Sequence, residues 1–313
     1  MEWIKPMEPI LRSDIPSGDT WIHQIKWDGI RGLTYIGQTG LRLYTKKGKE
    51  RTEIYPEIQQ LLKLVKANSV VLDGEMIILN DENKPSFELL LKRERVQTKE
   101  KVSFYSKKYP IKYILFDILY LNGENLTKKP LSERKDLLLK FVDQNENIAI
   151  TEDFKDGMML FELMREKEWE GIVSKHINSP YTGGKNHKDW YKIKLQRKML
   201  VVVGGVQWKY ELPNSLLLGI YRNGRLLFIG KASIGLKQLD LQILKEFVPK
   251  LKQTDSPFYQ ITAKINDVTW LKPTLTCWVQ FFDWTHEGQL RHPKILGFSP
   301  YLPKQAIGKE YVL

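Results

Sequence analysis

The chain has 313 residues, 42% of them hydrophobic and 27% charged, and this ordinary balance excludes a mostly disordered or fibrous protein. Its single cysteine excludes a disulfide framework and a zinc site built on several cysteines, and its five histidines lack the spacing typical of metal ligands. The net charge is +12, with +5 on residues 1–197 and +7 on residues 198–313, which favours a polyanionic partner such as nucleic acid and also suits an anionic membrane surface.

Short β-like runs alternate with helical patterns through the first two-thirds of the chain. Runs of β-branched, aromatic and aliphatic residues between turn residues predict strands, and apolar residues at helical spacing predict helices. We expect strands at residues 21–25, 40–45, 70–79, 113–121, 171–175 and 190–194, and helices over residues 54–66, 132–141 and 156–167.

Strands dominate after residue 197. We expect them at residues 200–206, 215–222, 226–230 and 276–284, with one helix over residues 236–251. Asn223-Gly224 between two of these runs predicts a tight hairpin. About five strands and one helix in a basic stretch of this length are typical of a small OB-type β-barrel. The chain is therefore predicted to be α+β, with domains at residues 1–197 and 198–313 joined by a short hinge.

The first motif with chemical content is Lys26-Trp27-Asp28-Gly29, directly after a predicted strand. Read alone, it is a turn, because Asp-Gly is common in hairpins and the flanking charges are solubilising. The alternative is a lysine nucleophile, whose amine attacks phosphorus only when neutral and whose pKa falls beside other cations. Gly29 would then let the backbone approach a bound phosphate closely.

Further charged motifs follow in a fixed order along the chain. Taken singly, each reads as a strand with charged flanks. On an extended strand, alternate residues share a face, so the two lysines of Lys-x-Lys point the same way. The motifs are Thr45-Lys46-Lys47-Gly48, Asp73-Gly74-Glu75, Phe116-Asp117, Glu170-Gly171 and Lys192-Ile193-Lys194.

Together these motifs resemble those of the covalent nucleotidyltransferases, specifically the ATP-dependent DNA ligases. The resemblance extends from about Ile4 to Lys304, and within the family it points to the ligase module of bacterial ligase D through residues 203–205, 215–219 and 290–293. It implies an adenylation (nucleotidyltransferase) domain of antiparallel sheets and helices, followed by a C-terminal OB-fold β-barrel.

The resemblance also implies a role for each motif residue. Lys26 would carry AMP as a phosphoramidate, while Lys192 and Lys194 neutralise the α-phosphate as charge builds on it. Glu75 and Glu170 would hold Mg²⁺ or Mn²⁺, which prefer carboxylate oxygen. Nucleotide contacts are implied for Gln24, Ile25, Arg31, Lys46, Glu75, Phe116 and Lys175, and DNA contacts for Lys231 and Arg291.

Two positions depart from the family pattern. Gln24 stands where relatives commonly have glutamate, and Lys46 where they often have arginine. The final motif, usually Arg-x-Asp-Lys, lacks its arginine and aspartate after Gly297, and only Lys304 is left to serve. That motif is associated with orienting pyrophosphate, so self-adenylylation is expected to be slow or differently assisted.

The implied function is an ATP-dependent DNA ligase that seals 5′-phosphate/3′-hydroxyl nicks or breaks in repair by end joining. We expect a monomer in the bacterial or phage-infected cytoplasm that acts on duplex DNA without a membrane, with a Ku-type end-binding protein as helper. Two alternatives stay open: an RNA ligase or GTP-using capping enzyme with the same lysine chemistry, and a non-catalytic module that binds DNA ends.

Overall fold

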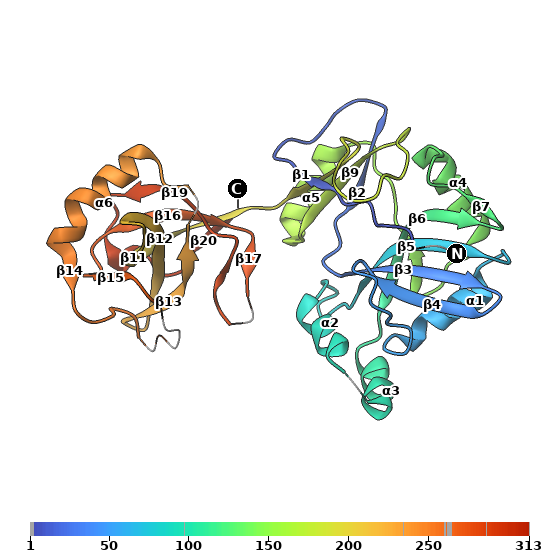
Figure 1. The fold of residues 1–313 in the computed structure, drawn as a ribbon, viewed down its shortest axis with the longest axis horizontal. Helices are drawn as coiled ribbons and strands as arrows, with labels where there is room; N and C mark the ends of the chain where they lie inside the picture. Colours follow the sequence, from blue (N-terminus) through green and yellow to red (C-terminus); the bar gives the residue numbers. More distant parts are fainter. Residues whose placement is uncertain are drawn as a thin grey trace. The chain divides into compact units, whose positions relative to one another are not determined.

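A computed structural model describes residues 3–312 of the chain apart from residues 97, 234, 260, 262–264 and 286. It divides the chain into two units, Met1–Lys194 and Leu195–Leu313 (Figure 1). The expected boundary lies three residues later, and the assignment of catalysis to the first domain and DNA binding to the second stays a prediction.

The larger sheet of the first unit has six strands, in the order β4-β3-β5-β6-β7, with β8 parallel to β6. Its central strands are long and nearly continuous in apolar residues because both faces of the sheet are covered. The strands are β3 (Ile30–Gly37), β4 (Gly40–Thr45), β5 (Val70–Ile77), β6 (Lys112–Leu121), β7 (Glu124–Asn125) and β8 (Ile148–Ile150).

The smaller sheet has four strands, in the order β1-β10-β9-β2. Segments far apart in the chain meet here, because β2 pairs antiparallel with β9 and β9 with β10. The strands are β1 (Ile10–Leu11), β2 (Trp21–Ile25), β9 (Gly171–His176) and β10 (Trp190–Lys194).

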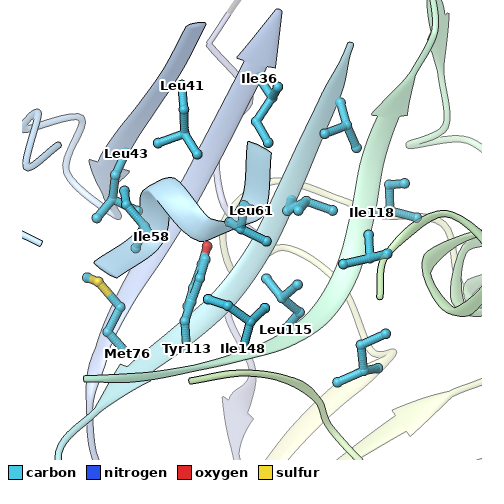
Figure 2. Packing of buried hydrophobic residues seen from close by; sticks show 14 of the residues in the cluster. Ile36, Leu41, Leu43, Ile58, Leu61, Met76, Tyr113, Leu115, Ile118 and Ile148 are labelled. Atoms are coloured by element: carbon cyan, nitrogen blue, oxygen red, sulfur yellow. The ribbon is translucent and has the colours of Figure 1, made fainter. Parts of the chain in front are cut away.

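Apolar clusters join these sheets to the helices. One face of the larger sheet packs on the short helical turn that carries Ile58 and Leu61 (Figure 2). The other face packs against Met7, Tyr181 and Trp190, beside the smaller sheet, and α5 covers that sheet's far side. The helices are η1 (Pro56–Gln60), α1 (Leu61–Leu64), α2 (Phe87–Glu94), α3 (Lys99–Lys108), α4 (Leu131–Phe141) and α5 (Gly157–Lys167).

The second unit is an antiparallel sheet of eight strands built around the long strand β11, which pairs with four others. Asn223 and Gly224 both have positive φ (49° and 73°), which the predicted tight hairpin requires. The elements are β11 (Arg197–Lys209), β12 (Leu212–Arg222), β13 (Arg225–Ala232), α6 (Gln238–Leu251), β14 (Lys252–Gln253), β15 (Val268–Leu271), β16 (Thr276–Phe281), β19 (Lys294–Ser299), η2 (Pro303–Gln305) and β20 (Glu310–Val312), with a separate ribbon of β17 (Asp283–Trp284) and β18 (Leu290–Arg291).

The predicted fold class is confirmed: mixed sheets and helices precede a C-terminal domain of antiparallel strands. Several details differ. The helix expected at residues 54–66 is a 3₁₀ turn plus one α turn, because Pro56 begins it and Val65 is already extended. The sequence did not predict helices α2 and α3. It also missed several strands, among them the central strand β3 and the shorter strands β8, β15 and β19. Within the described ranges, no helix is both long and apolar enough to cross a membrane.

Candidate active site

Three charged side chains meet at one end of the smaller sheet. Lys26 follows β2 directly, and its backbone N–H donates to the carbonyl of Gly171 at 2.9 Å. Lys194 at the end of β10 is also opposite Gly171, so both lysines flank Glu170. One carboxylate oxygen of Glu170 accepts from Nζ of Lys26 and the other from Nζ of Lys194, each at 2.5 Å.

Positive charge exceeds negative charge around this group. Burial raises the pKa of Glu170, but Lys26 and Lys194 more than offset burial, and the net pKa lies below its usual value. The pKa of Lys192 is lowered by burial and by repulsion from Lys26, Lys194 and Lys185. Cations that repel one another in a partly buried place form an anion site, and phosphate groups suit it.

Arg31, at the start of β3, is held in a fixed network. Its Nε and Nη2 donate to the carboxylate of Asp73 at 2.9 and 2.5 Å. Nη2 also donates to the hydroxyl of Tyr181 at 3.0 Å, and Nη1 donates to the carbonyl of Met7 at 2.5 Å. Within the described residues, one N–H of Nη1 is left without a partner, since a guanidinium has five.

Glu75, on β5, lies opposite Arg31 in the larger sheet. It makes no hydrogen bond or ion pair with any described residue. Its pKa is raised to about 8, mainly because it is removed from water, and repulsion from Glu170 and Asp73 contributes against the attraction of Lys26 and Arg31. A bound cation would stabilise the ionised form of this carboxyl group, which the protein itself leaves without a partner among the described residues.

A divalent metal ion fits the donor set. Magnesium typically takes one or two protein carboxylates and completes its shell with substrate phosphates and water. Glu75 and Glu170 supply two such carboxylates, and a cation bound to both relieves their repulsion. No cluster of three His, Cys, Asp or Glu side chains capable of holding a metal alone occurs in the described part of the chain. The substrate would therefore have to supply further ligands.

Phe116, Lys175 and Trp190 contact one another, and of the three Lys175 and Trp190 are buried while Phe116 is half-buried. Nζ of Lys175 lies 4.3 Å from the ring centroid of Phe116 and 4.0 Å from that of Trp190. This ammonium is buried without a hydrogen bond in the structure, and burial lowers its pKa to about 7. An acceptor atom of a nucleotide would satisfy it, so the site fits ATP. Stacking of adenine on Phe116 stays a prediction.

Three further residues that the resemblance assigned to the nucleotide, Gln24, Ile25 and Lys46, differ in their burial and in their partners. Gln24 lies on the same strand face as Lys26 and donates its amide to Asp153 at 2.7 Å. Ile25 points to the opposite face, where it packs near α5, so only its backbone is available to a nucleotide. Lys46 is exposed and pairs with Glu8 at 2.9 Å.

Two motif glycines allow close backbone packing. A Cβ on Gly29 would lie 2.3 Å from the carbonyl oxygen of Met76, so Gly29 is needed where the chain crosses β5. This close contact with protein backbone differs from the phosphate contact that the sequence suggested for Gly29. Gly171 has φ of +132°, and a Cβ there would lie 2.2 Å from the carbonyl oxygen of Ile193.

The expected DNA-binding residues belong to the second unit. Lys231 on β13 is exposed and donates to Gln207 at 3.2 Å, and Arg291 on β18 is exposed. Lys304, the remnant of the final motif, is exposed on η2. Their roles stay predictions.

Comparison with protein families decides the assignment. Residues 6–194 match the model of the ATP dependent DNA ligase domain, and residues 210–300 match the ATP dependent DNA ligase C terminal region. The chain belongs to the ATP-dependent DNA ligase family. The predicted resemblance is thus confirmed.

Individual ligases agree with this assignment. The chain is 31% identical over 290 residues to the Multifunctional non-homologous end joining DNA repair protein LigD of Mycobacterium tuberculosis. The match covers 90% of this chain but only 36% of LigD. The SPbeta prophage-derived DNA ligase-like protein LigB of Bacillus subtilis is 30% identical, and the match covers 88% of this chain and 91% of LigB. The structure of mycobacterial DNA ligase D complexed with ATP and MES is 28% identical with a TM-score of 0.52, covering 97% of this chain and 98% of that one.

Sequence reasoning missed several residues that position this ligase site. Tyr181 donates to Asp73 at 2.5 Å and accepts from Arg31, and Asp153 accepts from both Gln24 and Lys135. These partners lie more than 100 positions away from the groups they hold in three of these four contacts. No local pattern marks them.

Proposed function

We propose that the chain is an ATP-dependent DNA ligase that seals 5′-phosphate/3′-hydroxyl nicks or breaks through a lysyl-AMP at Lys26 and then a DNA–adenylate. The observation that carries the proposal is the contact of Glu170 with both Lys26 and Lys194, with Glu75 nearby. In a solubilising surface turn the lysine would be exposed, whereas Lys26 is mostly buried in its ion pair with Glu170. Membership of the ligase family supplies the reaction that such a group fits.

In the first step, neutral Nζ of Lys26 would attack the α-phosphorus of ATP, form a P–N bond and break the bond to pyrophosphate. The proton of Lys26 leaves for solvent as its ion pair with Glu170 is broken. Lys192 and Lys194 would neutralise charge that grows on the α-phosphate. Glu75 and Glu170 would hold Mg²⁺ or Mn²⁺, which supplies Lewis-acid charge to the phosphate oxygens.

End joining is proposed as the setting because the relatives named LigD carry non-homologous end joining in their names. The chain spans only about a third of the mycobacterial LigD proteins, so their whole activity does not transfer. A Ku-type protein as helper, and the cytoplasm as compartment, belong to the same proposal and rest on the sequence resemblance.

The test is transfer of label from α-labelled ATP to the protein, followed by denaturing electrophoresis. Wild type and Lys49→Ala, which changes an exposed lysine just after Gly48, should form a labelled band, whereas Lys26→Ala should not. Normal labelling of Lys26→Ala would refute the nucleophile. An unlabelled wild type would favour a DNA-end-binding module, and labelling by GTP or sealing of RNA alone would favour a capping enzyme or RNA ligase.

A further inference from the structure

Helix α3 is unusual because none of its side chains is buried. A helix with no buried side chain gains little stability from packing against the rest of the molecule. α3 is nevertheless well fixed: Thr98 caps its first turn, and its end is held by Arg93, which donates to the carbonyl of Tyr109 at 3.0 Å. Arg93 is itself buried and paired with Glu57.

The helix concentrates the positive charge of the first unit. Residues 95–108 carry a net charge of +4, against +5 for the whole of residues 1–197. All five cations of this segment are exposed and form no ion pair with any residue that the structure describes: Arg95, Lys99, Lys101, Lys107 and Lys108. Uncompensated cations at this density attract a polyanion.

An exposed aromatic ring stands among these cations. The side chain of Phe104 is 57% exposed. Lys101 and Lys108 are three residues before it and four after it, so all three share one face of the helix. Lys108 lies 5.7 Å from the Phe104 ring centroid. Apolar side chains amid cations are typical of surfaces that contact the sugars and phosphates of nucleic acid.

The segment that carries α3 is attached to the larger sheet at the end where Glu75 lies. β5 ends at Ile77, two residues after Glu75, and β6 begins opposite it at Lys112, so α2 and α3 leave and re-enter the sheet there. β3 begins at this end too, with Ile30 opposite Met76. Figure 1 shows α3 at the periphery of this unit, beyond α2.

We propose that α3 is a contact site for the phosphate backbone of duplex DNA, in the same unit as the nucleotide site and separate from the contacts expected in the second unit. This inference rests on the proposed function, since a ligase must hold duplex DNA at its active site. Four cations on α3, with Arg95 just before it, match a duplex, whose charges are closely spaced along its axis. One exposed ring is too little apolar surface for insertion into a membrane.

The test uses the full chain with Lys101, Lys107 and Lys108 changed to glutamine, which retains helix propensity. Affinity for a nicked duplex should fall, and the slope of log affinity against log salt should become shallower by about 2–3, at about 0.9 per phosphate contact. The matched control changes Lys63, Lys128 and Lys140 to glutamine. These are exposed, lie outside the segment between β5 and β6, and are equal in charge. Its slope should equal that of wild type.

A gain-of-charge variant tests the opposite direction. Glu100→Lys removes the only acidic residue of α3 and should raise duplex affinity and steepen the salt slope. Equal slopes for the α3 triple variant, its control and wild type would overturn the proposal. The proposal would also be overturned if the α3 triple variant lost binding to anionic vesicles but kept its DNA binding, since this result would identify a membrane surface instead.

Failure of this inference is distinguishable from failure of the proposed function. Label transfer from ATP to Lys26 needs no DNA, so the α3 variant should be labelled at the wild-type rate, which also shows that it is folded. A wild type that neither accepts label nor seals nicks would refute the ligase. If wild type and the α3 variant seal nicks equally well at low DNA concentration, the α3 contact alone is refuted.

Discussion

Glu170 forms ion pairs with Lys26 and Lys194 through separate oxygens, and this sharing affects both residues. The ion pair with the carboxylate holds Nζ of Lys26, and an amine must be neutral to attack phosphorus. A metal ion bound to Glu170 would compete for the same oxygens and favour release of the lysine. The carboxylate therefore both restrains and positions the nucleophile.

Removal of the charge of Glu170 should consequently impair the reaction and its use of metal. For Glu170→Gln we expect label transfer to fall by at least about a hundredfold and more Mg²⁺ to be needed, because metal and charge effects are each worth several kcal/mol. Glu166→Gln, at an exposed position on α5, is the control. If Glu170→Gln is labelled like wild type across a Mg²⁺ titration, Glu170 has only a structural role.

Lys175 should make stability depend on pH. Its pKa is lowered to about 7 by burial, from about 10.5 in an unfolded chain. Between these values the unfolded state binds more protons than the folded state, so this residue makes stability rise with pH. Lys175→Met removes the cost of the buried charge, and its gain in unfolding free energy should be about 1–3 kcal/mol larger at pH 6 than at pH 9.

Urea unfolding at the two pH values measures this difference. The rings of Phe116 and Trp190 favour the charged form of Lys175, which keeps the expected gain below the full pKa difference. An equal effect of Lys175→Met at both pH values would contradict the assigned pKa.

At the scale of strands, Gly171 determines how closely β9 and β10 approach beside Glu170. For Gly171→Ala we expect a loss of at least about 2 kcal/mol, because positive φ and a backbone collision act together. Gly123→Ala is the matched control: its φ is +97°, but nothing lies within 4 Å of its Cβ. It should lose only about 1 kcal/mol. Equal losses in urea unfolding would show that packing at Gly171 is unimportant.

The sequence predicted β5 and β6 because their apolar runs are continuous. It missed β3, whose apolar residues are interrupted by Arg31, Gly32 and Thr34. It missed α3 because that helix buries no residue and so has no apolar period. It marked Lys26, Glu170 and Lys194 because each stands in a short motif. It could not predict the contacts of Arg31 with Tyr181 and of Gln24 with Asp153, since the fold brings together residues that lie more than 100 positions apart.

At the scale of the whole molecule, the two units have separate apolar cores. Clusters around Leu72 and Trp190 belong to the first unit, and a cluster around Val201 and Leu218 belongs to the second. The motif residues from Lys26 to Lys194 all lie in the first. Each unit therefore has the apolar core that independent folding requires.

A chain that ends at Lys194 should accept label from ATP but lose most nick affinity and nearly all sealing. The missing arginine and aspartate after Gly297 predict that labelling suffers less than in relatives that retain them. The salt slope should fall but not to zero, because α3 remains. Nick affinity and salt slope unchanged by the truncation would contradict a DNA-binding role for the second unit.

The attachment of α3 also bears on how ligases of this kind diversify and how they can be engineered. The segment between β5 and β6 makes its main buried connection through Arg93 and Leu90, on α2, while α3 itself buries nothing. Substitutions in α3, or its exchange for a helix of different charge, should therefore leave the catalytic sheets intact. A more basic replacement would shift the working range of the enzyme toward higher ionic strength, and a less basic one would speed its turnover on tightly bound ends. Tolerance to salt is thus a property that selection, or a designer, can adjust at this one helix.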